Sequence, residues 1–434
     1  MRRALQYIGR VSRTQRIQKD ISGLTRHVSL ETVEYRPHST AISTAIPLTG
    51  PTPQVPGREP LLFTPGPLTC SAEVKRAMLV DLGSRDGLFL KVIQDVRDGL
   101  LHCAGVSREQ GFECILMQGS GTFSVEATIS SIIPKTGGKL LVLANGAYGE
   151  RIAQMAEIHA IPYTKISYPE LEVPTAEDAV EALKTDPSIT HVAMIHHETT
   201  TGALNPVNQV GRAIKEVKPE VTFIVDSMSG FGCYPIDLKK SRVDFLVSSS
   251  NKCIEGVPGF AYALADREKL LATEGSARTL SLDLLAQWKG LEANGQFRFT
   301  PPTHALLAFD QALKEHVAEG GVEGRLARYT HNFNTLKTDM AAMGFHPYLD
   351  EDKQGVIITT FLFPDDPAFD FPTFYNKLQA LGLVIYPGKL TKADCFRIGS
   401  IGRLFERDMR IMTQSVKAIL LEMGVQLPVK QIRV

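Results

Sequence analysis

The chain has 434 residues, 43% of them hydrophobic, and its 47 Lys and Arg residues balance its 47 Asp and Glu residues. This length predicts about two to three domains, with enough apolar residues for a sizeable core. A net charge of zero disfavours a protein that follows nucleic-acid phosphates, because such proteins are usually basic. No stretch approaches about 18 consecutive apolar residues, so we expect no transmembrane helix and no membrane partner.

The N-terminal segment, residues 1–34, differs from the rest of the chain. Its first 30 residues contain many basic side chains and one acidic side chain, Asp20. Leu5, Ile8 and Val11 recur at helical spacing. An Arg-rich, acid-poor and amphipathic start is typical of a mitochondrial transit peptide, which predicts a location in the mitochondrial matrix. The alternative is a basic tail on a cytoplasmic protein.

Residues 35–60 are rich in proline, serine and threonine, which predicts a linker, with folded structure from Leu61. From there to residue 312, apolar runs alternate with helical periodicity. We expect strands at 139–143, 191–195, 221–225, 243–247 and 260–264, and helices at 73–81, 88–103, 122–133 and 206–217. A further helix should begin after Thr175, a threonine cap followed by acidic residues. This alternation predicts a large α/β domain with a mostly parallel sheet between helices.

Residues 313–434 have a different pattern. Residues 304–343 predict one or two long helices, and strands are expected at 356–362 and 383–386 around a helix at 372–381. A last helix is expected at about 404–424. This order predicts a smaller C-terminal α+β domain packed on the large one.

The six cysteines contain no C-x-x-C pair, which indicates reduced thiols and neither a disulfide framework nor a metal site. They are Cys70, Cys103, Cys114, Cys233, Cys253 and Cys395. Cys253 adjoins a lysine of interest, but a cysteine between a strand and a turn is usually a small packing residue.

Lys252 lies on a polar, glycine-rich loop between the apolar runs 245–247 and 260–264. Partial desolvation lowers the pKa of an amine, and the neutral amine condenses with aldehydes. The loop therefore suits a lysine that binds an aldehyde cofactor covalently. Taken alone, a solvent-facing lysine is the simpler interpretation.

Two other loops would complete such a site. Asp226 ends the apolar run 221–225, and ligands of open α/β sheets bind at the carboxyl ends of strands. A carboxylate there could hold the protonated ring nitrogen of pyridoxal phosphate, although a helix N-cap is an alternative. Ser120, Gly121 and Thr122 open a predicted helix, where backbone N–H groups and hydroxyls can bind a phosphate.

Together these motifs make the chain resemble the class V, fold-type I, pyridoxal-phosphate-dependent aminotransferases over about residues 60 to 425. The matching strings occur at 62–68, 119–122, 145–149, 197–202, 225–229, 250–260, 280–288 and 396–399. The resemblance implies pyridoxal 5'-phosphate as the cofactor and a sheet of seven strands in the large domain.

The resemblance also implies roles for residues that spacing alone does not identify. Tyr148 would stack on the cofactor ring, and Thr199 would donate to its phenolic oxygen. Asn251 would help to hold the phosphate, and Thr300 would reach it from a neighbouring subunit, which implies a homodimer with shared active sites. Without the resemblance, Tyr148 reads as a packing residue and Thr199 as a cap.

For the substrate, the resemblance implies Arg397, whose guanidinium matches a carboxylate or phosphonate bidentately. Backbone N–H groups of the turn at Thr64 and Gly66 would assist. The branch of the family that the chain resembles most uses 2-aminoethylphosphonate and pyruvate, and forms phosphonoacetaldehyde and L-alanine.

Three alternatives stay open at the level of sequence. The chain could be an alanine–glyoxylate or serine–pyruvate aminotransferase, because the same cofactor residues serve both. A pyridoxal-phosphate lyase such as a cysteine desulfurase would need a cysteine on a mobile loop, and no cysteine occupies an obvious one. A nucleotide-binding or scaffolding α/β protein without covalent chemistry is the third.

Overall fold

The computed structural model describes residues 59–388 and 393–432. The expected targeting segment, and all but the last two residues of the expected linker, lie outside the described residues. The described part belongs to one compact unit, Val55–Val434. Among these residues, no helix is both long and apolar enough to cross a membrane.

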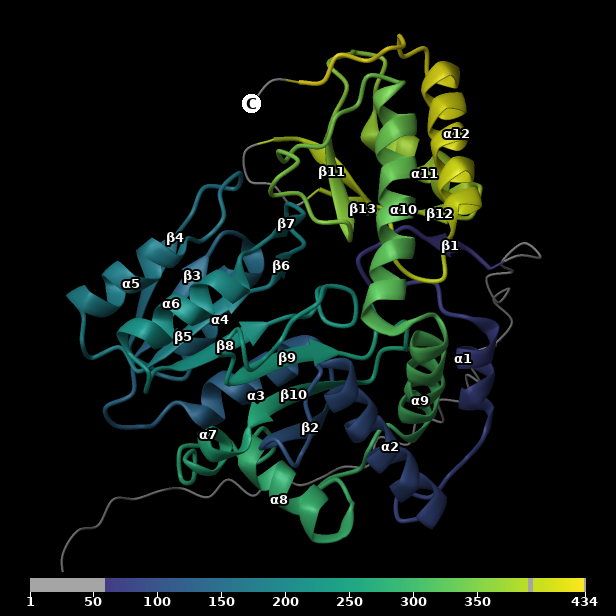
Figure 1. The fold of residues 1–434 in the computed structure, drawn as a ribbon. Coiled ribbons are helices and arrows are strands. Elements are labelled where there is room, and N and C mark those ends of the chain that lie inside the picture. The colour runs from purple at the N-terminus through teal and green to yellow at the C-terminus, as the bar shows by residue number, and fades with distance from the viewer. Residues whose placement is uncertain (1–58, 389–392, 433–434) are drawn as a thin grey trace, which may run out of the picture. The chain divides into compact units, whose positions relative to one another are not determined.

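A seven-stranded sheet forms the centre of the larger part of the chain (Figure 1). In spatial order its strands are β2 (Phe112–Gln118), β10 (Phe260–Asp266), β9 (Phe245–Ser249), β8 (Thr222–Asp226), β5 (His191–Ile195), β3 (Leu140–Ala144) and β4 (Tyr163–Ser167). All neighbours are parallel except β10, which is antiparallel to both β2 and β9. The prediction of a mostly parallel sheet is therefore confirmed.

The inner strands are buried along their whole length, which is why they appear in the sequence as continuous apolar runs. Strand β4 lies at the edge and alternates between exposed and half-buried residues. It carries no apolar run, so the sequence did not predict it. Strand β2 was also missed, because Glu113 interrupts its apolar pattern.

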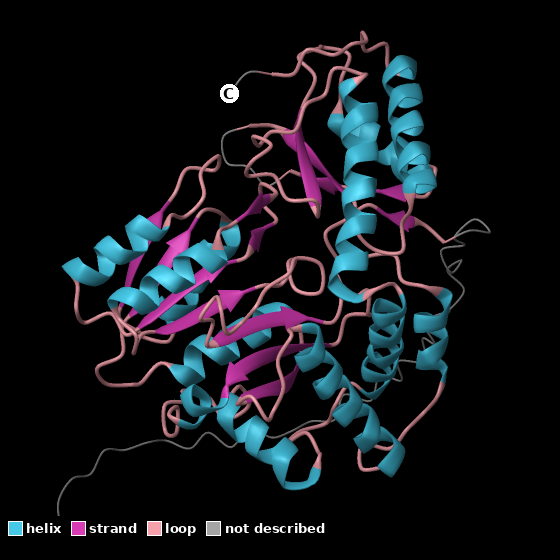
Figure 2. Cartoon of the chain, viewed as in Figure 1, coloured by secondary structure: helices cyan, strands magenta, loops and turns pink. Residues whose placement is uncertain are grey.

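Helices flank this sheet (Figure 2). They are α2 (Gly87–Cys103), α3 (Gly121–Ile132), α4 (Ala147–Ile158), α5 (Ala176–Thr185), α6 (Val207–Val217), α7 (Arg267–Leu271) and α8 (Leu284–Asn294). The short helix α1 (Ala72–Arg76) instead packs against the helix Thr303–Ala318. Helix α3 packs on β9 and β10. The expected threonine cap is present, since Thr175 accepts a hydrogen bond from the Asp178 N–H at the start of α5.

The C-terminal part contains a second, three-stranded sheet in the order β11 (Ile358–Leu362), β14 (Cys395–Gly399), β13 (Tyr386–Pro387). Its helices are α10 (Gly321–Ala341), α11 (Phe371–Ala380) and α12 (Glu406–Glu422), and α9 (Thr303–Ala318) precedes them. The expected helical stretch 304–343 divides into α9 and α10 at Gly320, whose φ of +102° is unsuited to a helix.

The start of the described chain joins this C-terminal part. Strand β1 (Leu61–Leu62) pairs in parallel with β12 (Leu383–Val384). Phe63 then enters a second hydrophobic core with Phe361, Phe374 and Phe396. The turn that follows β1 is thereby held next to β14, because the Gly399 N–H donates to the Phe63 carbonyl at 2.9 Å.

Candidate active site

The carboxyl ends of β2, β3, β5, β8 and β9 lie at one edge of the central sheet (Figure 1). A predicted site residue lies at or soon after the end of each strand. These are Ser120–Thr122 after β2, Tyr148 after β3, Thr199 after β5, Asp226 as the last residue of β8, and Lys252 after β9. Parallel pairing therefore brings these segments, which span more than 130 residues of the chain, to the same edge.

The Lys252 amine contacts the turn after β1. Its Nζ donates to the carbonyls of Pro65 and Gly66, both at 3.1 Å. A Cβ at Gly66 would lie 2.6 Å from the Asn251 carbonyl oxygen and 2.7 Å from Lys252 Cδ, and Gly66 has a φ of +118°. Only glycine allows this approach. Gly66, predicted to contact the substrate, thus lies directly against the lysine.

Asp226 is buried at the end of β8. Its Oδ1 accepts a hydrogen bond from the Met228 N–H at 2.9 Å. Burial, with a smaller contribution from Glu198, raises the pKa of Asp226 to about 7, although the Met228 N–H, Arg151 and Lys252 favour the charged form. The carboxylate lines a small cavity together with Thr122, Tyr148 and Arg151. It is not an N-cap, because no helix begins after it.

The start of α3 is packed against the turn that follows Asp226. A Cβ on Gly121 would lie 2.3 Å from the sulfur of Met228, so a side chain there would collide. Ser120 is the N-cap residue and makes no side-chain capping bond. Free N–H groups at a helix start favour an anion. The first turn of α3 therefore offers an anion site beside the small cavity.

Tyr148 lines the small cavity, and Thr199 lies in the loop that follows β5. Tyr148 belongs to the first turn of α4, and the Arg151 guanidinium carbon lies 5.0 Å from its ring centroid. Arg151 also donates to Thr122 Oγ1 at 3.4 Å. Thr199 is buried, and its carbonyl accepts from Arg397 Nη1 at 2.8 Å. These contacts join α3 to α4, and the loop after β5 to the strand that carries Arg397.

Arg397 reaches the site from β14. Besides its bond to the Thr199 carbonyl, its Nε donates to the Pro387 carbonyl at 3.1 Å, and its guanidinium carbon lies 5.9 Å from the Tyr386 ring centroid. Burial lowers its pKa. The guanidinium is therefore fixed in orientation by two carbonyls and is largely desolvated, which strengthens its attraction for an anion.

The remaining predicted residues are less directly placed. The Thr64 hydroxyl donates to the Pro67 carbonyl at 2.5 Å, so it is used within its own turn. Asn251 Oδ1 accepts from Ser249 Oγ at 3.0 Å. Thr300 is exposed, and its carbonyl accepts from Gln118 Nε2 at the end of β2 at 3.2 Å.

Sequence reasoning missed two charged residues of the site. Arg151 faces the small cavity, and only its helical spacing from Tyr148 could have suggested it. Glu198 is fully buried and accepts from the Thr200 N–H at 3.0 Å, and burial raises its pKa. A Cβ on Gly146 would lie 2.4 Å from Glu198 Cδ, so this carboxylate is tight against the start of α4.

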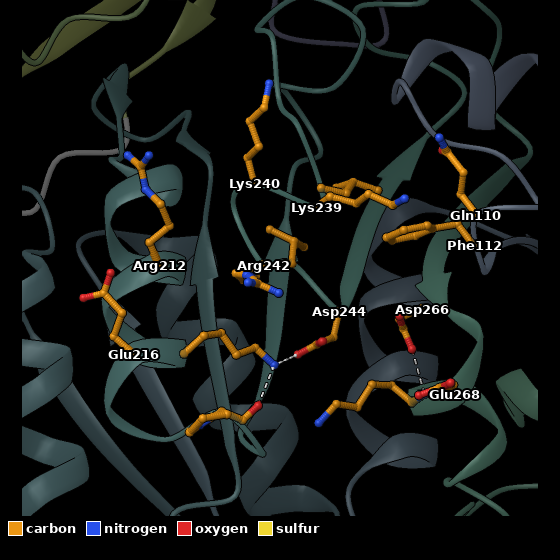
Figure 3. Close-up of a pocket in the computed structure, with 15 residues that line it drawn as sticks. Gln110, Phe112, Arg212, Glu216, Lys239, Lys240, Arg242, Asp244, Asp266 and Glu268 are labelled. Atoms are coloured by element: carbon orange, nitrogen blue, oxygen red, sulfur yellow. Dashed lines mark hydrogen bonds and ion pairs between the residues drawn. The ribbon is translucent and has the colours of Figure 1, made fainter.

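A wider cavity of about 1110 Å³ lies at the other end of the strands, next to the residues that precede β9 (Figure 3). Asp244 there pairs with Lys215 at 2.6 Å. Its lining mixes basic residues such as Arg212 with acidic ones such as Glu268, and includes none of the predicted site residues. Cavity size alone therefore does not identify the active site of this chain.

Comparisons with known proteins agree with this geometry. A family model described as "Aminotransferase class-V" matches residues 80–374. A protein of Klebsiella pneumoniae subsp. pneumoniae named 2-aminoethylphosphonate–pyruvate transaminase is 46% identical over 361 residues, covering 83% of this chain and 97% of the relative. One of the same name from Salmonella paratyphi C is 44% identical over 362 residues, with the same shares covered.

Solved structures show the same fold. Pyridoxamine-pyruvate aminotransferase from Mesorhizobium loti matches with a TM-score of 0.77 and 22% identity, covering 85% of this chain and 94% of that one. Alanine–glyoxylate aminotransferase from Nostoc sp. matches with a TM-score of 0.76 and 24% identity, covering 84% and 96%. The fold expected from the motifs is thereby confirmed.

Proposed function

The chain belongs to the class-V aminotransferase family, and we propose that it transfers the amino group of 2-aminoethylphosphonate to pyruvate. The products are phosphonoacetaldehyde and L-alanine. The observation that carries this proposal is the 44–46% identity to transaminases named for this pair, over 97% of their length. The alanine–glyoxylate enzyme that matches in structure is only 24% identical, so an alanine–glyoxylate or serine–pyruvate activity is the second candidate.

Pyridoxal 5'-phosphate is the proposed cofactor, and the residues present fit it. A lysine amine, a buried carboxylate and the start of a helix lie at one edge of the sheet. Asp226, Thr122 and Tyr148 also line one small cavity there. When bound, the cofactor supplies an aldehyde for an amine and a ring that accepts electrons from the substrate carbon. Asp226 would accept a hydrogen bond from the protonated ring nitrogen, and that cation would hold the carboxylate in its ionised form.

The first turn of α3 would hold the phosphate. The backbone N–H groups of this turn and the hydroxyls of Ser120 and Thr122 would donate to the phosphate. Asn251, which precedes Lys252 in the chain, would also help to hold it. Gly121 supports this role, because its missing side chain lets the turn approach Met228. Thr199 would donate to the phenolic oxygen of the cofactor.

Lys252 would bind the cofactor and then move a proton. Its stem is confined by Gly66, and the carbonyls of Pro65 and Gly66 accept from its amine. As a free amine, Nζ would act as the base that takes the proton from the substrate carbon and as the acid that returns it. The two carbonyls would keep the amine within reach throughout.

Arg397 would bind the phosphonate of the donor and the carboxylate of pyruvate. Two of its nitrogens donate to the carbonyls of Thr199 and Pro387, so the guanidinium is already oriented when an anion arrives. The backbone turn at Thr64 and Gly66 would contribute further N–H donors, since it lies against β14.

A donor panel tests the proposal. Purified protein with pyruvate should form alanine from 2-aminoethylphosphonate at a kcat/KM well above that from serine, and alanine with glyoxylate should be a poor pair. Arg397→Lys should lower kcat/KM for 2-aminoethylphosphonate about tenfold or more, because lysine cannot donate bidentately. A preference for serine or for alanine with glyoxylate would favour the second candidate instead.

We also propose that the active enzyme is a homodimer in which Thr300 serves the neighbouring active site. Exposed apolar side chains near the proposed phosphate site support a covering partner: Phe123 follows Thr122 on α3, and Phe299 precedes Thr300. Both are more than 40% exposed in the single chain. Light scattering should give twice the chain mass, whereas a fully active monomer would contradict the proposal.

For the ends of the chain we propose the organisation expected from the sequence: a targeting segment 1–34, a linker 35–60, a large domain 61–312 and a small domain 313–434. The separate cores support the last boundary, since the core around the large sheet ends at Leu313. A fusion of residues 1–40 to a fluorescent protein should enter mitochondria. A diffuse signal would favour the cytoplasmic alternative, which agrees with relatives that come from bacteria.

A further inference from the structure

Glu255, three residues after Lys252, has an unusual backbone. Its φ is +65°, in the left-handed region that glycine, asparagine and aspartate adopt far more readily than glutamate. Its N–H donates to the Lys252 carbonyl at 2.7 Å, so this conformation closes the loop that carries the lysine. Such a residue persists only where its surroundings determine its conformation.

The surroundings that hold Glu255 are contacts of its buried carboxylate. Oε1 accepts from the Tyr329 hydroxyl at 2.6 Å and from Arg328 Nη2 at 2.7 Å, and it pairs with Arg325 Nη1 at 3.3 Å. Arg325 also donates to the carbonyl of Cys253. Three side chains of α10 thus hold the backbone just after Lys252.

The same side chains bind the segment that follows β14. Arg328 Nη1 donates to the carbonyls of Gly402 at 2.6 Å and Leu404 at 3.0 Å. The Tyr329 hydroxyl accepts from the Gly402 N–H at 3.2 Å. Because β14 carries Arg397, this network joins the loop of the proposed catalytic lysine to the strand of the proposed substrate-binding arginine.

The charges of the network balance. Glu319 supplies the second carboxylate, accepting from Arg325 Nε at 2.9 Å and from Arg328 Nε at 2.6 Å. Two guanidiniums therefore meet two carboxylates, and removing one carboxylate would leave a buried positive charge unpaired. The arrangement is rigid because every member has several partners.

We propose that Glu255 is a positioning residue that fixes the Lys252 loop against the segment after Arg397. It holds the amine and the guanidinium at a constant separation while substrates of different size exchange. The inference rests on the proposed function of Lys252. Glu255 itself would contact neither cofactor nor substrate and would act only through its neighbours.

Glu255→Gln tests the inference, with Glu113→Gln as the matched control. Glu113 is equally buried and also lies between two arginines, pairing with Arg267 at 2.7 Å and Arg97 at 3.7 Å, but it is on β2 away from Lys252. In apoprotein, Glu255→Gln should speed amide hydrogen exchange in peptides covering residues 250–256 and 400–404 together. Glu113→Gln should leave both peptides unchanged.

The second measurement is the rate at which added pyridoxal phosphate forms its visible absorption band with the protein. Glu255→Gln should slow it by about tenfold or more, because a small displacement of a reacting group is costly. Tyr329→Phe, which keeps the shape and the charges, should slow it less and also loosen both peptides. Tyr329→Phe therefore replaces Glu255→Gln in both measurements if Glu255→Gln does not fold.

The results separate the two proposals. If the wild-type protein forms no such band, the proposed function itself fails. If the wild type forms it, and Glu255→Gln or Tyr329→Phe matches the wild type in both measurements, only the role of Glu255 fails. A change in peptide 250–256 without one in 400–404 would also contradict the coupling.

Discussion

At the scale of single residues, the proposed site contains a buried carboxyl group whose ionisation is unfavourable in the folded apoprotein. Asp226 is a carboxyl whose burial raises its pKa to about 7. A group with a raised pKa in the folded state stabilises the fold fully below its unfolded pKa, near 3.8, and this contribution is lost as the pH rises through 7. The apoprotein should therefore lose stability between pH 4 and pH 7 because of this residue.

Asp226→Asn makes that loss measurable. The amide oxygen can still accept from the Met228 N–H, and no charge has to be buried. In the absence of cofactor, its free energy of unfolding relative to wild type should increase from pH 4 to pH 7, by up to about 4 kcal/mol. Urea unfolding at several pH values measures this difference. The same difference at all pH values would show that Asp226 is not desolvated as described.

Gly66 is the residue that sets how closely the β1 turn approaches Lys252. In Gly66→Ala the new Cβ would meet the Asn251 carbonyl oxygen at 2.6 Å with a φ of +118°. We expect a loss of stability of about 1–3 kcal/mol and a much slower reaction of Lys252 with an aldehyde. Gly105→Ala is the control, since Gly105 also has a positive φ, +66°, but nothing lies within 4 Å of its Cβ. Equal effects of the two changes would contradict the role given to Gly66.

At the scale of elements, the sequence predicted what local pattern can encode. Buried parallel strands appear as apolar runs, and the residues that follow them were correctly expected at one edge of the sheet. Strands β4 and β14 were not predicted, because one is a half-exposed edge strand and the other is a short run around Arg397. Contacts such as Glu255 with Tyr329 join residues far apart in the chain, so no local pattern reports them.

Helix α3 carries a prediction at this scale, because its first turn is positioned by the β8 loop. Gly121→Ala would place a Cβ 2.3 Å from the Met228 sulfur, next to the turn that Asp226 anchors. The helix start should shift, and the affinity for inorganic phosphate and for pyridoxal phosphate should fall together. Calorimetric titration measures both. Unchanged phosphate binding would mean that the anion site lies elsewhere.

At the scale of the whole molecule, the proposed active site lies where two parts of the chain meet. The large sheet supplies Asp226 and Lys252, while β14 of the C-terminal part supplies Arg397. The β1 turn, from the start of the described chain, lies between them and contacts Lys252. The motifs made this assembly predictable only through resemblance to a known family. The spacing of residues in the sequence identified candidate loops but not the distances between those loops in the fold.

A covalent bond between Lys252 and pyridoxal phosphate is the central feature of the proposed site. Protein saturated with the cofactor should be reduced with borohydride, digested and mapped by mass spectrometry. We expect the peptide that contains Lys252 to carry the reduced cofactor, with Lys252→Ala as the control that loses it. An unmodified Lys252 peptide, or a cofactor found on another lysine, would contradict the assignment of this site.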